Sequence, residues 1–229
     1  MGVVVAAAGR GDRLAGPVPK QFLPVAGVPL LLRAVRPFLA HPDVALVIVA
    51  LPADAAAAPP RWLAELLGER LRAVSGGATR MDSVEAGLRA LPAGCEFVLV
   101  HDGARPFPDA AVIDAVLAGA RRGAGAIAAV RVTDTLKESD PGAESSPRVR
   151  RTVPRTALWR AQTPQGFPRA LLERAYACAH ATGAGGTDEA ALVEQAGGAV
   201  MLVPDVATNL KVTTQHDLRL AEAIAALSR

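Results

Sequence analysis

The sequence predicts an α/β fold, in which a mostly parallel, twisted β-sheet carries helices on both faces and a β-hairpin arm protrudes. Three observations support this prediction. Short apolar runs alternate along the chain with segments of helical periodicity, a succession typical of parallel sheets. The apolar runs are continuous, as in strands that are buried on both faces. One segment, at about 133–155, breaks this succession with a cluster of turn residues.

The expected strands and helices follow one another closely through the first half of the chain. In order they are a strand at 3–8, a helix at 29–40, a strand at 44–51, a helix at 61–71, a strand at 72–74, a helix at 79–90 and a strand at 97–100. Pro37 is expected to kink or shorten the first of these helices, because proline cannot donate the helical hydrogen bond.

The second half continues the same alternation around the arm. It is expected to contain a helix at 110–121, a strand at 126–132, helices at 168–181 and 188–196, a strand at 199–203 and a helix at 214–228. Ligands of open α/β sheets bind beyond the carboxyl ends of the strands. The loop 9–20 and the polar cluster 101–106 both follow strands, so we expect them to meet in one crevice.

The segment at about 133–155 is interpreted as a hairpin arm. An acidic, turn-rich stretch precedes the basic stretch 148–155, and the flanks alternate well enough for two strands. An arm with little core of its own usually packs against another surface, for which a second copy of the chain is the simplest candidate. A disordered surface loop is the alternative. We expect residues 1–229 to form a single domain with this arm, since 229 residues can build one substantial core.

Composition argues against several classes of function. No apolar stretch reaches the roughly 18 residues that a membrane helix needs, and the first residues lack the basic flank of a secretory signal. We therefore expect a soluble, cytoplasmic protein that does not engage a membrane. Cys95 and Cys178 have neither metal-binding spacing nor a disulfide framework. The net charge is only +3 and the basic stretch 148–155 lacks aromatic residues, so no nucleic-acid partner is expected.

A loop rich in small residues follows the first strand and suits phosphate binding. Residues 6–14 read Ala-Ala-Ala-Gly-Arg-Gly-Asp-Arg-Leu, and residues 19–21 read Pro-Lys-Gln. Small residues let backbone N–H groups approach phosphate oxygens closely. The dinucleotide fingerprint would need glycine in place of Leu14, and the P-loop would need lysine in place of Pro17. Neither of these two motifs therefore applies.

Lysine is rare in this chain and marks candidate positions for chemistry. Among 25 Lys and Arg residues, only Lys20, Lys137 and Lys211 are lysines. A lysine ammonium is a compact point charge that a planar guanidinium does not replace. Arg13 and Lys20 are the cations of the glycine-rich loop, where they would stabilise charge on a transferring phosphoryl group. Chance and ordinary solvated side chains are the alternatives.

Seven polar or glycine-rich motifs follow one another along the whole chain, at 7–14 with 19–21, 75–84, 100–106, 134–137, 161–165, 187–189 and 209–213. In this order they resemble the motifs of the 2-C-methyl-D-erythritol 4-phosphate cytidylyltransferase family. The set is specific in this order, whereas each motif alone is weak evidence. Ribitol 5-phosphate cytidylyltransferases share much of the set, so it identifies the reaction class more firmly than the acceptor.

The resemblance implies a Rossmann-like nucleotidyltransferase fold and a reaction. CMP would pass from CTP to 2-C-methyl-D-erythritol 4-phosphate with release of pyrophosphate, as a step of non-mevalonate isoprenoid precursor synthesis, with Mg²⁺ as cofactor. In-line attack by the acceptor phosphate needs no covalent intermediate, so positioning and charge stabilisation would carry the catalysis. The resemblance also implies a homodimer formed through the arm.

The resemblance assigns roles to individual residues. The catalytic residues would be Arg13, Lys20, Arg155 and Lys211. The nucleotide would be bound by Ala7, Ala8, Gly9, Gly77, Arg80, Ser83, Asp102 and Gly103. The acceptor would be bound by Arg105, Thr135, Arg155, Thr163, Thr187 and Lys211.

Some of these roles are more specific. Gly77, through its backbone, and Ser83, through its hydroxyl, would read cytosine, and Asp102 would bind Mg²⁺. Thr135 and Arg155 would reach from the arm into the partner subunit's site. The plain alternatives are that Asp102 caps the turn after its strand and that Ser83 is an ordinary polar residue of its helix.

Two positions depart from the family pattern, and other functions compete. Pro154 and Thr208 stand where family members often carry an acidic residue, which affects the acceptor assignment more than the chemistry. Within enzymes, the competitors are ribitol 5-phosphate cytidylyltransferases and NTP-sugar pyrophosphorylases. A non-catalytic nucleotide-binding protein is the competitor from another class. It would need the loop but not the joint presence of Lys20, Asp102 and Lys211.

Overall fold

A seven-stranded sheet forms the centre of the computed structural model, which describes residues 1–9, 18–140 and 147–227. Its strand order is β11-β7-β10-β6-β1-β4-β5. The strands are β1 (Gly2–Ala6), β4 (Leu46–Leu51), β5 (Leu71–Ser75), β6 (Phe97–Asp102), β7 (Gly125–Arg131), β10 (Trp159–Pro168) and β11 (Val200–Pro204). Neighbouring strands pair in parallel except for β10, which is antiparallel to β6 and β7. The predicted mostly parallel sheet is confirmed.

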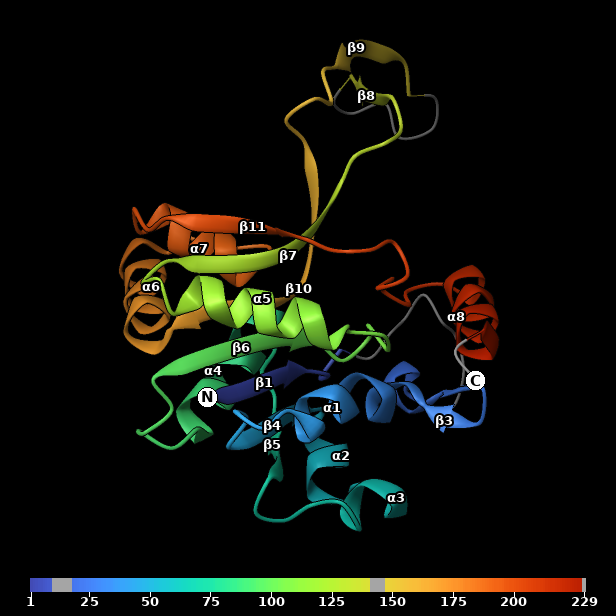
Figure 1. Cartoon of the computed structure of the whole chain (residues 1–229), viewed down its shortest axis with the longest axis vertical. Helices are drawn as coiled ribbons and strands as arrows, with labels where there is room; N and C mark the ends of the chain where they lie inside the picture. The colour runs from blue at the N-terminus through green and yellow to red at the C-terminus, as the bar shows by residue number, and fades with distance from the viewer. Residues whose placement is uncertain (10–17, 141–146, 228–229) are drawn as a thin grey trace.

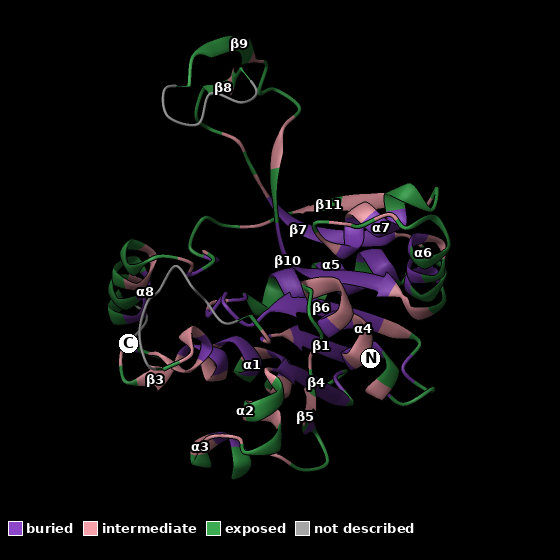
Figure 2. Cartoon of the chain, turned by 180° about the vertical axis from the view of Figure 1, so that it is seen from behind, coloured by how far each residue is buried: buried purple, intermediate pink, exposed green. Residues whose placement is uncertain are grey.

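Helices cover both faces of the sheet (Figures 1 and 2). One face carries α1 (Leu30–Ala40), α2 (Ala53–Ala57), α3 (Arg61–Ala64) and α5 (Ala110–Ala120), and the other carries α4 (Arg80–Ala90), α6 (Arg169–Thr182) and α7 (Glu189–Gln195). Alternate residues of β1 show why both faces are needed. Val3 and Val5 pack with α1 and α5, whereas Val4 packs with α4 and α6. Because side chains of a strand alternate between faces, an all-apolar strand requires a helix layer on each side.

The last helix, α8 (Gln215–Leu227), stands apart from the two main layers (Figure 1). Ala221 and Ala225 of α8 pack into a smaller apolar cluster with Val25 and Leu30. A two-stranded hairpin, β2 (Pro24–Val25) with β3 (Val28–Pro29), and a single 3₁₀ turn, η1 (Lys20–Phe22), lead from the first loop into α1. This cluster therefore joins the C-terminal helix to the segment that carries Lys20.

Three sequence-based expectations differ from the structure. The helix expected at 61–71 ends at Ala64, where only Leu63 is fully buried, and the N–H of Gly68 turns back to the carbonyl of Leu71. Of the two effects expected of Pro37, the shortening is wrong, since α1 runs to Ala40, and the kink stays a prediction. The long strand β10 was not expected at all, since Pro164 and Gly166 weaken its β-strand pattern. A register shift against β7 between Ala161 and Gln165 accommodates this part of the strand.

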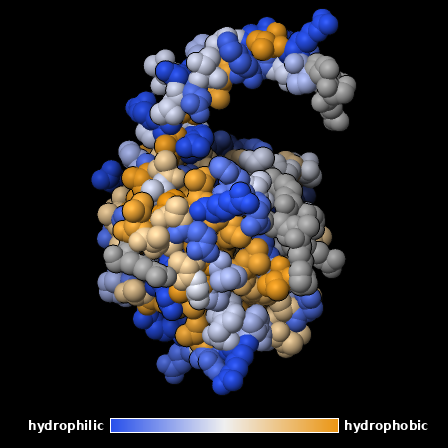
Figure 3. Space-filling model, turned by 90° about the vertical axis from the view of Figure 1, so that its right-hand side faces the viewer, coloured by the Kyte–Doolittle hydropathy of each residue, from blue (hydrophilic) through white to orange (hydrophobic). Residues whose placement is uncertain are grey.

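The expected arm is present and protrudes from the body of the molecule (Figures 1 and 3). It consists of β8 (Leu136–Ser139) and β9 (Val149–Val153), which pair with each other in antiparallel fashion and form a sheet of their own. Glu138 forms ion pairs across the two strands with Arg150 and Arg151. Leu136 and Val149 are exposed. The described part of the arm therefore has no core of its own.

No helix within residues 1–9, 18–140 and 147–227 is long and apolar enough to cross a membrane.

Candidate active site

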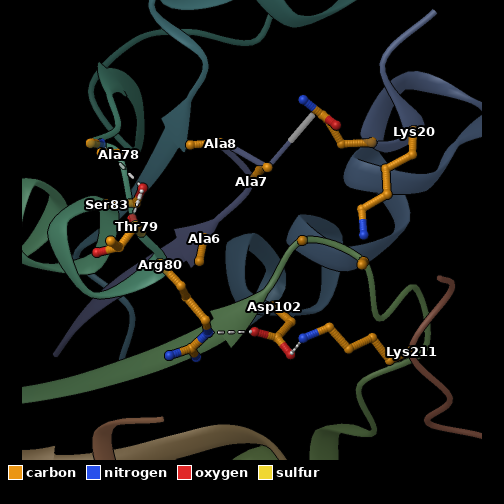
Figure 4. Close-up of a pocket in the computed structure, with 15 residues that line it drawn as sticks. Ala6, Ala7, Ala8, Lys20, Ala78, Thr79, Arg80, Ser83, Asp102 and Lys211 are labelled. Carbon is orange, nitrogen blue, oxygen red and sulfur yellow. Dashed lines mark hydrogen bonds and ion pairs between the residues drawn. The ribbon is translucent and has the colours of Figure 1, made fainter. Parts of the chain in front are cut away.

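A pocket lies beyond the carboxyl ends of β1 and β6, where the sequence predicted that two polar clusters would meet (Figure 4). Four chain segments supply its walls: the end of β1, η1, the start of α4 and the end of β6, with Lys211 beside them. The lining residues include Ala7, Ala8, Gly9, Lys20, Gly77, Arg80, Ser83, Asp102, Gly103 and Lys211. The structure thus brings together every predicted nucleotide-binding residue and two of the predicted catalytic residues. Arg13 lies outside the described residues.

The turn before α4 holds Gly77 against Ser83. Thr79 caps the helix, and its Oγ1 accepts the N–H of Asp82 while the Asp82 carboxylate accepts the N–H of Thr79. The Ser83 hydroxyl donates to the Thr79 carbonyl at 2.8 Å and accepts the N–H of Gly77 at 3.2 Å. A Cβ at Gly77 would lie 2.2 Å from the Cβ of Asp82. Only glycine therefore fits here without a shift of its neighbours.

Asp102 ends β6 and lies between two cations (Figure 4). Its Oδ1 accepts a hydrogen bond from Arg80 Nε at 3.1 Å, and its Oδ2 lies 2.8 Å from Lys211 Nζ. Arg105 Nε is 3.5 Å from Oδ2, an ion pair without hydrogen-bond alignment. Burial by itself would raise the pKa of Asp102, but Arg80, Lys211 and Arg105 outweigh it and hold that pKa well below its usual range. Asp102 is therefore ionised at neutral pH.

Arg80 is itself held from the far side by a buried carboxylate. Arg80 Nη1 donates to both oxygens of Glu189, at 2.9 and 2.8 Å, and the Tyr176 hydroxyl donates to Glu189 Oε1 at 3.2 Å. Burial opposes the charged guanidinium, but Glu189 and Asp102 prevail and raise the pKa of Arg80. Glu189 is 1% exposed. Its charge therefore depends on Arg80, because an unpaired buried carboxylate is costly.

Comparison with known proteins identifies the family of the chain. A family model described as 2-C-methyl-D-erythritol 4-phosphate cytidylyltransferase matches residues 1–226. The chain belongs to this family. A protein of that name from Streptomyces coelicolor is 44% identical over 234 residues, which cover 99% of this chain and 85% of the relative.

Two further relatives show the extent of the match. A bifunctional IspD/IspF enzyme from Anaeromyxobacter dehalogenans is 48% identical over 96% of this chain but 56% of its own length. The chain thus spans about half the length of several curated relatives it matches. The crystal structure of 2-C-methyl-D-erythritol 4-phosphate cytidylyltransferase from Thermus thermophilus superposes with a TM-score of 0.81. It is 40% identical, with 98% of both chains covered.

The residues that the family resemblance assigns to the acceptor are dispersed in this structure. Arg105 is buried beside Asp102, and its Nη1 donates to the Asn209 carbonyl at 2.8 Å, which fixes the segment leading to Lys211. Thr135 and Arg155 are exposed on the arm segment, where Arg155 Nη1 donates to the Thr133 carbonyl. Their action in a partner's site stays a prediction.

The two remaining acceptor assignments lie outside the pocket lining. Thr187 is exposed just before α7. Thr163 is 3% exposed, and its hydroxyl contacts the backbone of Asp102 and the ring of His101 rather than the pocket. Neither residue lines the described pocket. Their contact with an acceptor also stays a prediction.

Asp102 fits a magnesium ion that arrives with a nucleotide. Within the described residues, no group of three or more His, Cys, Asp and Glu side chains could hold a metal ion. Mg²⁺ commonly uses only one or two carboxylates, with phosphate oxygens and water completing the octahedron. Asp102 offers one ionised carboxylate in the pocket, now paired with Arg80 and Lys211. A metal at Asp102 would take the place of one of these cations.

Sequence reasoning missed the buried polar residues that support the site. Glu189 and His101 lie inside two of the family motifs, yet neither was assigned a role. Gln21 lines the pocket, is 2% exposed, and has no hydrogen-bond partner for its amide within the described part of the chain. The signal that could have found Glu189 is its position directly before the apolar run Ala190–Val193 at the start of a short helix.

Proposed function

We propose that the chain transfers CMP from CTP to 2-C-methyl-D-erythritol 4-phosphate, releasing pyrophosphate and forming 4-diphosphocytidyl-2-C-methyl-D-erythritol. The observation that carries the proposal is the position of Asp102 between Arg80 and Lys211, in the same pocket as Gly77 and Ser83. Family membership supports the choice of both substrates. We place the reaction in the cytoplasm, because its nucleotide substrate is a cytoplasmic metabolite.

The reaction requires charge stabilisation more than acid–base chemistry. An oxygen of the acceptor phosphate forms a bond to the α-phosphorus of CTP, and the bond from that phosphorus to the bridging oxygen breaks. Pyrophosphate leaves with the electron pair. Lys20 and Lys211, which extend into the pocket from different segments (Figure 4), would neutralise charge on the reacting phosphates. Mg²⁺, held by Asp102, would supply further neutralisation of the triphosphate.

The turn before α4 supports selection of cytosine. The N–H of Gly77 is already given to Ser83, so its carbonyl is available to accept from the amino group of cytosine. Uracil carries a carbonyl at that position, so two acceptors would face each other without a hydrogen between them. Gly77 is exposed in the free chain, and once a bound base covers it, such a mismatch would leave polar atoms unpaired and disfavour uracil.

The arm supports a homodimer with shared active sites. Its described strands pair only with each other, and Thr135 and Arg155 lie within two residues of them along the chain. In the proposed dimer, the arm of one subunit reaches the other subunit's pocket, where Arg155 joins Lys211 around the acceptor phosphate. Two cations around one phosphate dianion are physically reasonable.

The test is pyrophosphate release with CTP and Mg²⁺, run in parallel with 2-C-methyl-D-erythritol 4-phosphate and ribitol 5-phosphate. We expect release with the first acceptor and little with the second. Release with ribitol 5-phosphate alone would keep the mechanism but overturn the acceptor. UTP in place of CTP should support little turnover, and comparable rates with the two nucleotides would contradict the role of Gly77.

A further inference from the structure

The C-terminal helix α8 contacts the two chain segments that carry the pocket lysines. Lys20 lies in η1, which leads into the hairpin β2–β3, and Lys211 lies just before the start of α8 at Gln215. Figures 1 and 2 show α8 beside β3 and away from the sheet and its two helix layers. Lys20 and Lys211 enter the pocket from these two separate segments (Figure 4). One helix therefore reaches the supports of both pocket lysines.

The first contact holds the turn of the β2–β3 hairpin. Glu222 Oε2 of α8 accepts the N–H of Ala26 at 2.8 Å. Ala26 and Gly27 form the two-residue turn, with φ angles of +46° and +75°. A positive φ is free of steric cost for glycine but uncommon for alanine, so the surrounding structure must hold Ala26 in this conformation. Glu222 supplies part of that support from a distant part of the chain.

The hairpin connects this contact to Lys20. The N–H of Leu30 donates to the Leu23 carbonyl at 2.9 Å, and the N–H of Leu23 donates to the Lys20 carbonyl at 3.1 Å. Val25 and Leu30 are buried in the apolar cluster that contains the alanines of α8. The backbone of Lys20 is therefore joined to α8 by hydrogen bonds through the hairpin and by apolar packing.

The second contact fixes the segment that follows Lys211. One carboxylate oxygen of Asp217, Oδ2, accepts the N–H and the hydroxyl of Thr213 at 2.9 and 2.8 Å and the N–H of Thr214 at 2.8 Å. Burial raises the pKa of Asp217, but the hydrogen bonds from Thr213 and Thr214 outweigh it and lower that pKa to about 2. The ionised carboxylate in the first turn of α8 thus holds the backbone close behind Lys211.

Apolar packing joins the two segments to each other. The alanines of α8 lie in one buried cluster with Val25 of the hairpin and with Val212, the residue after Lys211. This cluster is separate from the two larger clusters that pack the faces of the sheet. A substitution on α8 can therefore disturb the lysine segments while the two larger clusters keep their packing.

We propose that Glu222 and Asp217 are positioning residues for the two pocket lysines, and that α8 holds both lysines in place for the reaction. Neither carboxylate is among the described residues that line the pocket, so each acts through the segment it contacts. This inference rests on the proposed transfer reaction for its kinetic consequence. Lys20 and Lys211 neutralise charge on the reacting phosphates, and a misplacement of about 1 Å can cost about 100-fold in rate.

The first test measures Glu222 variants in the cytidylyl-transfer assay. Glu222→Ala should lower kcat about 10-fold with the KM for CTP changed less than about threefold, because the turn before α4 reads the base. Glu222→Gln keeps an oxygen acceptor and should recover most of kcat. The control is Glu173→Ala, which also removes a hydrogen-bonded helix carboxylate, but one whose partner Arg169 lies outside the described pocket lining. This variant should leave kcat unchanged.

The second test measures Asp217→Ala, which should also lower kcat about 10-fold, here through Lys211. This change weakens the start of α8 as well, so Asp109→Ala is the matched control. Asp109 caps α5 by accepting the N–H of Ala111 at 2.7 Å and lies outside the described pocket lining. Thermal unfolding should show a loss of stability in both variants, whereas only Asp217→Ala should lose kcat.

Double variants test whether each carboxylate acts through its own lysine. The loss caused by Glu222→Ala should disappear in a Lys20→Ala background, because the group that it positions is gone, and should persist in a Lys211→Ala background. Asp217→Ala should show the opposite pattern. A general loss of stability would lower activity equally in both backgrounds, and that result would overturn the inference.

A measurement without turnover separates this inference from the proposed function. The chain contains only three lysines, so ¹³C labelling of lysine gives three sets of side-chain NMR signals, which replacement of each lysine by arginine assigns. Glu222→Ala should move the Lys20 signal and Asp217→Ala the Lys211 signal, whereas the Lys137 signal should stay in place. Unchanged Lys20 and Lys211 signals would overturn the positioning roles. Absence of transfer by the unmodified chain would overturn the proposed function, while the NMR signals would still decide the role of α8.

Discussion

At the scale of single residues, the three lysines separate into two environments. Lys20 and Lys211 line the pocket, and Lys211 Nζ lies 2.8 Å from Asp102 Oδ2. Lys137 lies on the arm, where its Nζ donates to Thr152 Oγ1 at 2.7 Å. Rarity of lysine was therefore a useful guide to two of the three positions. It could not distinguish the third, because composition carries no information about which segments meet.

Lys20→Ala and Lys211→Ala should each lower kcat/KM about 100- to 1,000-fold, since each removes a preorganised charge from the reacting phosphates. Lys137→Ala is the matched control and should change kcat/KM little. The measurement is steady-state pyrophosphate release at saturating Mg²⁺. An equal loss in all three variants would point to general destabilisation instead of a role in the transition state.

His101 makes the stability of the fold depend on pH. Its pKa is about 4 in the folded chain and 6.5 in a model peptide, so the unfolded chain takes up the proton first as the pH falls. The free energy of unfolding should therefore decrease from about pH 6.5 downwards, by about 3 kcal/mol at pH 4, with 1.36 kcal/mol for each pKa unit. Urea unfolding of the unmodified chain and of His101→Asn over this range measures the difference. A constant difference between the two would refute the assignment to His101.

At the scale of secondary-structure elements, β10 and the turn before α4 do most to shape the site. β10 lies between β6 and β7, and its irregular stretch near Thr163 lets that residue reach the backbone of Asp102. The strand pattern of this segment is weak because Pro164 and Gly166 interrupt it. Pairing with two neighbours stabilises β10 in spite of its sequence, and such pairing is visible only in the assembled sheet. The length of α3 was also not visible in the local sequence pattern. Its apolar residues suggested a helix at 61–71, but the helix ends at Ala64.

Gly77→Ala should weaken CTP binding by disturbing the turn before α4. The added methyl would lie 2.2 Å from the Cβ of Asp82, so the capping box of α4 would have to shift, at a cost of about 1–3 kcal/mol. Gly68→Ala is the control, since nothing lies within 4 Å of a Cβ there. Calorimetric titration with CTP and thermal unfolding measure the two effects. Unchanged CTP affinity in Gly77→Ala would contradict the role of this turn in base recognition.

At the scale of the whole molecule, the protruding arm is the feature that the main sheet and its helices do not need for their own packing. The described strands β8 and β9 pair only with each other and stand away from the main sheet. Exposed Leu136 and Val149 leave apolar surface on the arm. A partner subunit is the proposed means of covering that surface and of bringing Arg155 to a pocket.

Mixing two inactive variants tests whether active sites are shared. Arg155→Ala and Lys211→Ala should each be nearly inactive alone. If the arm acts in the partner's pocket, half of the randomly reassembled dimers contain one of each, and one of their two sites is intact. Activity should then recover to about a quarter of that of the unmodified chain, by the symmetry of a two-fold dimer. No recovery after verified subunit exchange would mean that the arm acts on its own subunit or not at all.

The sequence by itself determined the α/β class, the order of most strands and helices, the arm and the family. These properties follow from local patterns, since hydrophobic periodicity and short motifs are read along the chain. Tertiary structure alone decided that β10 lies beside β6, that Glu189 holds Arg80 and that His101 and Thr163 hold Asp102. These contacts join residues far apart in the chain. Their physical cause is burial, because a buried polar group must find a partner wherever the fold places one.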